Sequence, residues 1–261
     1  MDTQKMNDNK EDIYCQTKKD TPELHLIVLW HNARYREKEI LEDIQKNLQI
    51  VECYDIKWSK DKVASNFTRF YGEKLDNGSF KEKECGTDSF LLVVVMDNSP
   101  VYEFVETSRG SEYVNVNLFN LKSKYREWTR GGHKIHTTNT PEETNHDITL
   151  LLGVNYEDYL AEHNGNWDGK IKSIERNLTG AEEWKSLEEL FSTLNATVNY
   201  AVLRNYEFLP SAYVSDKHGD IDILTDDYVN TCYIVNAKPV FEEEYRVHNY
   251  TMVNGQKVLL M

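Results

Sequence analysis

Two acidic side chains in the last quarter of the chain have the types and spacing that suit metal-dependent chemistry. Asp220 and Asp222 stand at positions i and i+2 of a short strand-like segment, so both side chains point to the same face. Paired carboxylates of this kind are the ligands that Mg²⁺ ions, or Mn²⁺, would use. Gly219 lets a triphosphate approach, and Arg204 and Lys217 are available to bind its phosphates.

The segment HGDIDIL, residues 218–224, resembles the Asp-x-Asp strand of the polymerase-β-type nucleotidyltransferases. The resemblance implies that Asp220 and Asp222 hold metal ions, which activate a hydroxyl for attack on the α-phosphate of a nucleoside triphosphate. The family has an upstream Gly-Ser pair, of which only Ser211 is a partial match here. It also needs a third carboxylate on a later strand. We therefore expect a truncated form of a longer protein or a half that has lost catalysis, and a solvated strand end is the alternative.

A second segment, HKIHTTNTPEETNHDI over residues 133–148, combines histidines with acidic and hydroxyl side chains. It resembles the histidine segment of nucleoside diphosphate kinases. In that family a strand-end histidine is phosphorylated by a nucleoside triphosphate and passes the phosphoryl group on. Carried over by position, the resemblance implies that His136 is the phosphorylated residue and that Asp147 steadies it. Glu142 falls on an acidic helix position.

The chemistry of these residues agrees with that implication. An imidazole acts as a nucleophile when a carboxylate or carbonyl holds its other nitrogen, because that hydrogen bond fixes the tautomer. Asp147 lies on the helix predicted directly after the histidine, so it could reach back to His136. Arg126, Arg130 and Lys134 supply positive charge for phosphates nearby.

The chain departs from the kinase pattern at two places. The kinases end their first strand with a catalytic lysine followed by Pro-Asp-Gly, whereas this chain has Trp30, His31, Asn32 and Ala33. His133 replaces the asparagine that precedes the kinase histidine. Two other interpretations stay open: a nucleotide or phosphate pocket without self-phosphorylation, and a polar residue at a strand end.

The elements that must position His136 are predicted to alternate between strands and helices. Apolar runs predict strands over 24–30, 50–58 and 90–96. Helical spacing predicts helices over 36–48 and 59–71. A strand or short helix is expected over 101–109, and a polar loop over 75–85. Thr140, Pro141 and Glu143 predict a helix that ends at Gly153.

The second half has its own series of predicted elements. We expect a helix over 182–195, strands over 199–203 and 220–224, and a short helix capped by Asp226. Asn254-Gly255 predicts a terminal hairpin. The predicted fold is α+β: a flexible arm (1–22), a ferredoxin-like domain similar to the kinase core (23–153), a linker (154–180) and a small, partial nucleotidyltransferase-like domain (181–261).

Composition limits the classes of partner. The 261 residues carry 30 Lys and Arg against 44 Asp and Glu, a formal net charge of −14. We expect no coating of nucleic acid, because phosphate backbones are bound by clustered basic residues. No membrane-spanning run or apolar leader is evident, so a cytoplasmic location is expected. Oligomers are compatible with the sequence.

The sequence predicts a metal-dependent phosphoryl- or nucleotidyl-transfer protein that acts on a nucleoside triphosphate or a phosphorylated small molecule. The alternative is a non-catalytic nucleotide-binding or regulatory module that keeps the folds of such enzymes.

Overall fold

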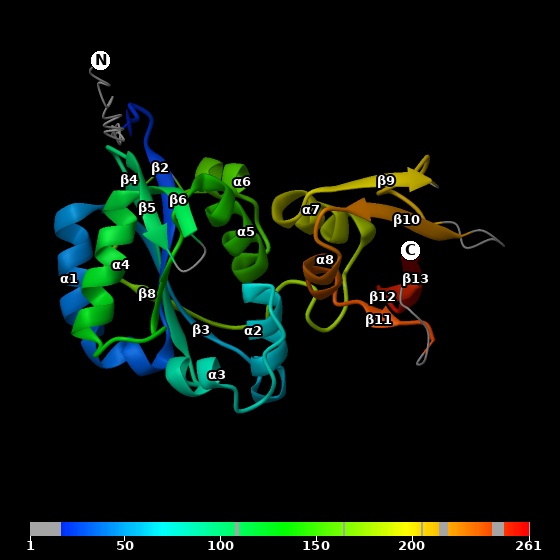
Figure 1. Cartoon of the computed structure of the whole chain (residues 1–261), viewed down its shortest axis with the longest axis horizontal. Helices are drawn as coiled ribbons and strands as arrows, with labels where there is room; N and C mark the ends of the chain where they lie inside the picture. The colour runs from blue at the N-terminus through cyan, green and yellow to red at the C-terminus, as the bar shows by residue number, and fades with distance from the viewer. Residues whose placement is uncertain are drawn as a thin grey trace, which may run out of the picture.

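The computed structural model describes residues 17–107, 110–163, 165–204, 206–213, 219–241 and 248–260. Helices and strands are mixed along the chain, and the strands form three sheets. Figure 1 shows two parts, one around the larger, N-terminal sheet and one around the sheet that includes β9 and β10. The predicted α+β class is therefore confirmed.

The first sheet is central to the N-terminal part. Its strands are β2 (Glu23–Leu29), β3 (Gln49–Lys57), β4 (Phe90–Asp97), β7 (Ile135–Thr137) and β8 (Ile171–Glu175). They lie in the order β7-β2-β4-β3-β8, and all neighbours are antiparallel except β3 and β8. β2 and β4 are buried almost throughout, which is why their sequences read as continuous apolar runs.

Helices cover both faces of this sheet (Figure 1). The helices on one face are α1 (Glu37–Asn47) and α4 (Val116–Trp128), which place Ile40, Ile44 and Tyr125 in one core cluster. The helices on the other face are α2 (Val63–Tyr71) and α5 (Pro141–Leu152), which place Phe67 and Ile148 in a second cluster. The sheet thus carries two hydrophobic cores, and His136 of β7 alternates with Ile135, which is buried in the first of them.

Several elements differ from the sequence expectations. The interval expected to be a polar loop contains α3 (Phe80–Cys85), whose N-terminal amide of Glu82 bonds the Ser79 hydroxyl. The strand or short helix expected over 101–109 is the strand β5 (Val101–Thr107), which pairs with an additional strand, β6 (Gly110–Asn115), and α4 follows β6. Asn115 caps α4, and Leu118, Leu121 and Tyr125 have the helical spacing that indicates its buried face.

The segment predicted as a linker, 154–180, contains α6 (Tyr156–Glu162) and β8. β8 is the edge strand of the first sheet and pairs in parallel with β3. An edge strand pairs through its backbone along one side only and needs few apolar residues. Its sequence therefore resembles that of a connecting loop. In the predicted arm, Thr17–Lys18 form β1 beside β5, and residues 1–16 lie outside the described part.

The second sheet has the order β11-β12-β13-β10-β9. The strands are β9 (Tyr200–Arg204), β10 (Asp220–Thr225), β11 (Lys238–Pro239), β12 (Asn249–Val253) and β13 (Gln256–Leu260). The helices of this part are α7 (Leu187–Thr197) and α8 (Tyr228–Ile234). Asn254 and Gly255 both have positive φ between β12 and β13, so the predicted hairpin is confirmed.

The two parts share one cluster of buried side chains. It extends from Leu92 of the first sheet to Ile221 and Leu260 of the second. Arg69 of α2 adds polar contacts, because its guanidinium donates to the carbonyls of Tyr233 and Ile234 at the end of α8. The division at residue 181 remains an interpretation of the sequence.

Candidate functional site

His136 and Asp147, predicted from the sequence as a pair, are in direct contact. The Nε2 atom of His136 lies 2.7 Å from Oδ2 of Asp147. β7 carries the histidine and α5 carries the aspartate, and the short turn between them brings the two side chains together. The His136 side chain is 16% exposed and that of Asp147 4%, so the carboxylate lies underneath and the imidazole faces the surface.

Asp147 also holds a second histidine. Nδ1 of His146 lies 2.9 Å from Oδ1 of Asp147, so each carboxylate oxygen has one imidazole partner. Burial by itself would raise the pKa of Asp147, but His136 and His146 lower it below its ordinary value. An ionised carboxylate can only accept, so Nε2 of His136 carries a proton, and in the neutral imidazole Nδ1 keeps its lone pair. Within the described residues, Nδ1 of His136 has no hydrogen-bond partner.

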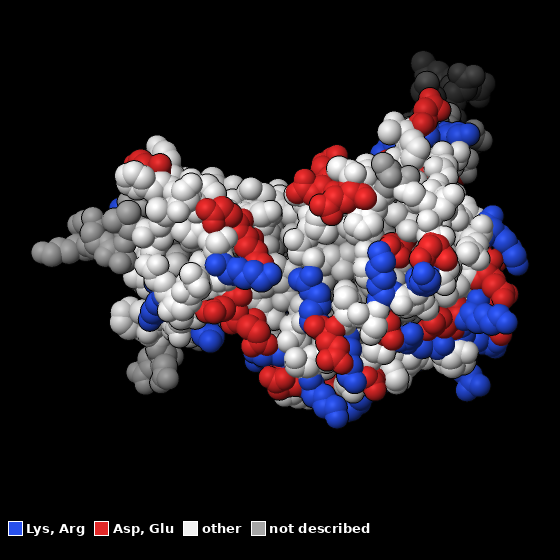
Figure 2. All heavy atoms as spheres, turned by 180° about the vertical axis from the view of Figure 1, so that it is seen from behind, with Lys and Arg blue, Asp and Glu red and all other residues white. Residues whose placement is uncertain are grey.

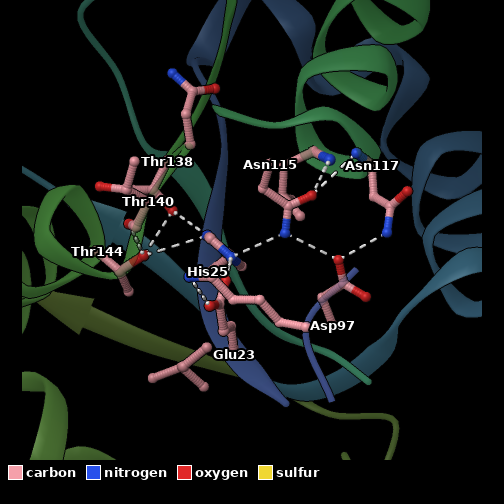
Figure 3. A network of polar contacts seen from close by, with 12 residues as sticks. Glu23, His25, Asp97, Asn115, Asn117, Thr138, Thr140 and Thr144 are labelled. Atoms are coloured by element: carbon pink, nitrogen blue, oxygen red, sulfur yellow. Dashed lines mark hydrogen bonds and ion pairs between the residues drawn. The ribbon is translucent and has the colours of Figure 1, made fainter. Parts of the chain in front are cut away.

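A buried polar network fixes the turn between His136 and α5 (Figure 3). His25 of β2 is fully buried, and its Nδ1 lies 3.3 Å from Oγ1 of Thr138 and 3.4 Å from Oγ1 of Thr144. Thr138 also accepts from the backbone of Leu26 and from Thr144. These bonds tie the turn after His136, the helix α5 that carries Asp147, and the strand β2 to one another.

The polar network continues on the other side of the His25 imidazole, at Nε2. Its Nε2 lies 3.3 Å from Nδ2 of Asn115 and 3.5 Å from Oε2 of Glu23. Asn115 donates in turn to Asp97, and its Oδ1 caps α4. Figure 3 shows His25 between these two groups of partners, which come from the starts of α4 and α5. The imidazole therefore links the two helices that flank the end of β7.

Aromatic and basic side chains surround His136. The rings of Phe70 and Tyr71 meet its imidazole edge-on, with centroids 5.3 and 6.0 Å away. Nζ of Lys81 lies 3.2 Å from the centroid of the Tyr71 ring. Burial lowers the pKa of Lys81 and of Arg126, and burial together with these two cations lowers the pKa of His133. The surroundings are thus partly desolvated and positively charged.

The three basic residues predicted to bind phosphate near His136 differ in their contacts and exposure. Arg126 donates from Nε to the carbonyl of Ile135, and no carboxylate pairs with it within the described residues. Nζ of Lys134 instead donates to two backbone carbonyls, those of Thr129 and Gly131. Arg130 is an exposed residue with positive φ. Arg126 is therefore the predicted cation best placed to meet a phosphate beside His136.

The C-terminal pair is on β10, as predicted, and lies next to Arg204 of β9. Arg204 donates from Nε to Asp222 and approaches Asp220 at 3.8 Å. The hydrogen bond from Arg204 lowers the pKa of Asp222 below its ordinary value. Arg204, predicted to bind phosphate, thus pairs with the carboxylates themselves, and Lys217 lies outside the described residues.

The donor set at Asp220 and Asp222 fits Mg²⁺ or Mn²⁺ by type and falls short in number. Two carboxylates on one strand face are oxygen donors of the right kind. Across the described part of the chain, no three His, Cys, Asp or Glu residues are grouped so as to hold a metal ion. The residues described here therefore do not complete the site for a metal pair that the nucleotidyltransferase resemblance implies.

Sequence reasoning missed several residues of the His136 site. Tyr71, Lys81 and His25 are distant in sequence and carry no local motif, so only the packing of α2, α3 and β2 reveals them. His146 is different, because its position directly before Asp147 was a usable signal.

Two further observations concern the distribution of surface charge and the length of the helices. On the face drawn in Figure 2, basic side chains alternate with acidic ones and form no continuous stripe. No helix among the described residues is both long and apolar enough to span a lipid bilayer.

Comparisons with known proteins give little further information. No protein-family model matches the chain, and no curated protein matches it. A crystal structure of the Aquifex aeolicus nucleoside diphosphate kinase is similar to part of it, with 15% sequence identity and a TM-score of 0.34. The similar region covers 53% of this chain and 99% of the kinase chain. This is a weak structural similarity, and the chemistry proposed below depends on the geometry around His136.

Proposed function

We propose that this protein transfers a phosphoryl group through Nδ1 of His136, from a nucleoside triphosphate or a phosphorylated small molecule. The observation that supports this most directly is the contact of His136 with buried Asp147, which leaves Nδ1 with a lone pair and without a partner in the described residues. Arg126 would meet the negative charge of the donor, and Lys81, which also pairs with Glu73 at 3.6 Å, lies against the Tyr71 ring beside it.

The bonds, electrons and charges of the proposed phosphoryl transfer balance with groups that the donor and this chain supply. The Nδ1 lone pair attacks the terminal phosphorus, the bond from phosphorus to the bridging oxygen breaks, and the diphosphate leaves with its electron pair. The ring becomes a phosphorylated imidazolium that keeps its proton on Nε2, where ionised Asp147 balances the charge. A second acceptor can then take the phosphoryl group from Nδ1.

Strand order supports a ferredoxin-like core as part of this proposal. The strands β2, β3, β4 and β7 are the first to fourth in sequence within their sheet and lie in the order fourth, first, third, second. Helices follow the first and third of them, and all three pairings among the four strands are antiparallel. This is the strand order of a βαββαβ unit, with α2 and α3 inserted between its second and third strands and the β5–β6 hairpin after the third.

Phosphorylation of the full chain tests the proposal. We expect incubation with radiolabelled ATP to give an acid-labile, base-stable label on the protein, and His136→Ala to abolish it. Asp147→Asn removes the charge that stabilises the imidazolium, so labelling should slow by about 10²-fold or more. His146→Asn is the matched control, because it loses a bond to the same carboxylate without touching His136.

The outcomes of this labelling experiment distinguish histidine phosphorylation from nucleotide binding without catalysis. Label that survives His136→Ala, or no label under any condition, would refute histidine phosphorylation. A thermal shift with ATP in the absence of label would favour the non-catalytic nucleotide-binding module instead.

We also propose that Asp220 and Asp222 bind a divalent cation, because their carboxylates share one face of β10 and lie side by side. Calorimetric titration with Mg²⁺ and with Mn²⁺ should show binding that the double variant Asp220→Asn, Asp222→Asn loses. Asp226→Asn, an exposed aspartate just beyond the same strand, is the control and should bind as the wild type does. Equal binding by the double variant would exclude this site.

A further inference from the structure

A cleft of about 640 Å³ lies away from His136, on the side of the first sheet covered by α1 and α4. The end of α1, the first residue of β3, the end of β4 with the turn after it, and α4 between Asn117 and Lys124 line it. This volume is within the range of small-molecule sites. The functions proposed above use none of its residues.

Side-chain amides dominate the lining. Six of the twelve lining residues are carboxamides: Gln45, Asn47, Gln49, Asn98, Asn117 and Asn120. Each carboxamide offers two N–H donors and a carbonyl acceptor, so it can donate to and accept from a hydroxyl group that also does both. A wall of such groups matches a ligand that presents many hydroxyls.

Several of these groups are held in place before any ligand binds. Asn98 donates to Gln49, and Gln49 donates to Asn166. Asn117 uses Nδ2 for Asp97 and for the carbonyl of Ser99, which leaves its Oδ1 for a ligand. Amides with fixed orientation lose little conformational entropy on binding.

The floor of the cleft is a buried carboxylate. Asp97 is 3% exposed and accepts hydrogen bonds from Asn115, Asn117 and the backbone of Ser99. Figure 3 shows that Asn115 connects Asp97 to His25, so the floor belongs to a rigid network. A carboxylate with fixed partners is a strong acceptor for ligand hydroxyls.

The charges disfavour an anionic ligand. Lys124 is paired with Asp43 at 2.8 Å, so one of the two lysines of the lining is already neutralised. The negative Asp97 would repel a phosphate or carboxylate. The lining contains no aromatic side chain, so a nucleobase would find no ring on which to stack.

We propose that this cleft binds a neutral polyhydroxylated ligand, a sugar or an oligosaccharide. The carboxamides of its walls exchange hydrogen bonds with the ligand hydroxyls. No residue of the lining contacts His136 or Asp147, so the two proposals can fail separately.

Saturation-transfer NMR on the full chain tests this assignment. The probes are glucose, galactose, mannose, N-acetylglucosamine, rhamnose, myo-inositol, maltose and sucrose, each at millimolar concentration. We expect transfer to at least one of them, unchanged when inorganic phosphate is added. Asn120→Leu and Gln45→Leu should each weaken that binding roughly tenfold, since each removes one or two hydrogen bonds.

These variants keep the test free of folding effects. The side chains of Asn120 and Gln45 are exposed at the rim and form no hydrogen bonds within the described residues, so their replacement breaks no side-chain hydrogen bond. Ser123→Leu adds the same side chain to α4 outside the lining and should bind as the wild type does. No transfer from any probe, equal binding by both rim variants, or displacement by phosphate would each overturn the proposal.

Discussion

At the scale of single residues, the main feature is that buried charged side chains have hydrogen-bond partners. Asp147 is covered by the fold and still ionised, because an imidazole bonds each of its oxygens. A buried carboxylate without such partners would take up a proton and could no longer fix the tautomer of His136. The proposed nucleophile thus depends on a hydrogen bond that also stabilises the fold.

Glu23 of β2 gives a pH-dependent prediction at this scale. Burial would raise its pKa, but hydrogen bonds with His25, Lys19 and Tyr102 lower the pKa from 4.5 to about 2. Because the folded-state pKa is the lower one, the unfolded chain binds more protons between these values. The stabilisation by Glu23 is therefore complete above about pH 4.5 and is lost as the pH falls toward 2.

We expect Glu23→Gln to be less stable than the wild type at neutral pH, with a difference in the free energy of unfolding that shrinks toward pH 2. Urea titrations at several pH values measure this difference. Glu162→Gln, the same change at an exposed position at the end of α6, should show no such trend. A difference for Glu23→Gln that stays constant with pH would contradict the assignment.

At the scale of elements, α5 decides whether the proposed site exists. The helix begins at Pro141 directly after the histidine turn, and Asp147 is one of its inward-facing residues. Its first turn is closed as the sequence predicts, with the Thr140 hydroxyl accepting from the amide of Glu143. The Glu143 carboxylate accepts from the amide of Asn139, one residue before the position that a standard capping box uses.

Loss of this cap should loosen the start of α5. Thr140→Ala leaves the amide of Glu143 without its acceptor and should lower the free energy of unfolding by about 1 kcal/mol. Thr140→Ser keeps the hydroxyl and should stay close to the wild type. Urea unfolding followed by circular dichroism compares the three proteins, and an alanine variant as stable as the wild type would show that the cap contributes nothing.

At the scale of the whole molecule, Arg69 joins the two sheets through α2 and α8. Arg69 is 3% exposed, and its guanidinium donates to the carbonyls of Thr179, Tyr233 and Ile234. No carboxylate pairs with it within the described residues, and burial lowers its pKa to about 10. The carbonyl dipoles at the end of α8 therefore stabilise the charge.

Replacement of Arg69 should weaken the joint between the two parts. Arg69→Met removes three hydrogen bonds and leaves the buried carbonyls of Thr179 and Ile234 without their donor, and we expect a loss of about 3 kcal/mol in the free energy of unfolding. Arg130→Met, the same change at an exposed arginine, should cost less than about 0.5 kcal/mol. Urea unfolding followed by tryptophan fluorescence measures both, and equal losses would rule out a special role for Arg69.

Local chemistry determined a large share of this protein. Apolar runs predicted β2, β3 and β4, and the residues Thr140, Pro141 and Gly153 predicted both ends of α5. The contact between His136 and Asp147 also followed from sequence, because one short turn separates strand from helix and limits where the two side chains can lie. Such signals are strong when the partners are near each other in the chain.

The tertiary structure decided the features that depend on contacts between residues far apart in the sequence. The sequence predicts a linker where β8 lies, because an edge strand shows its role only once β3 lies beside it. The side chains of His25 and Arg69, and the pairing of Arg204 with Asp222, depend on elements far apart in sequence. A sequence specifies residue types and local spacing, whereas the burial and neighbours of a charged group, and hence its protonation and bonding, arise only when remote elements pack together.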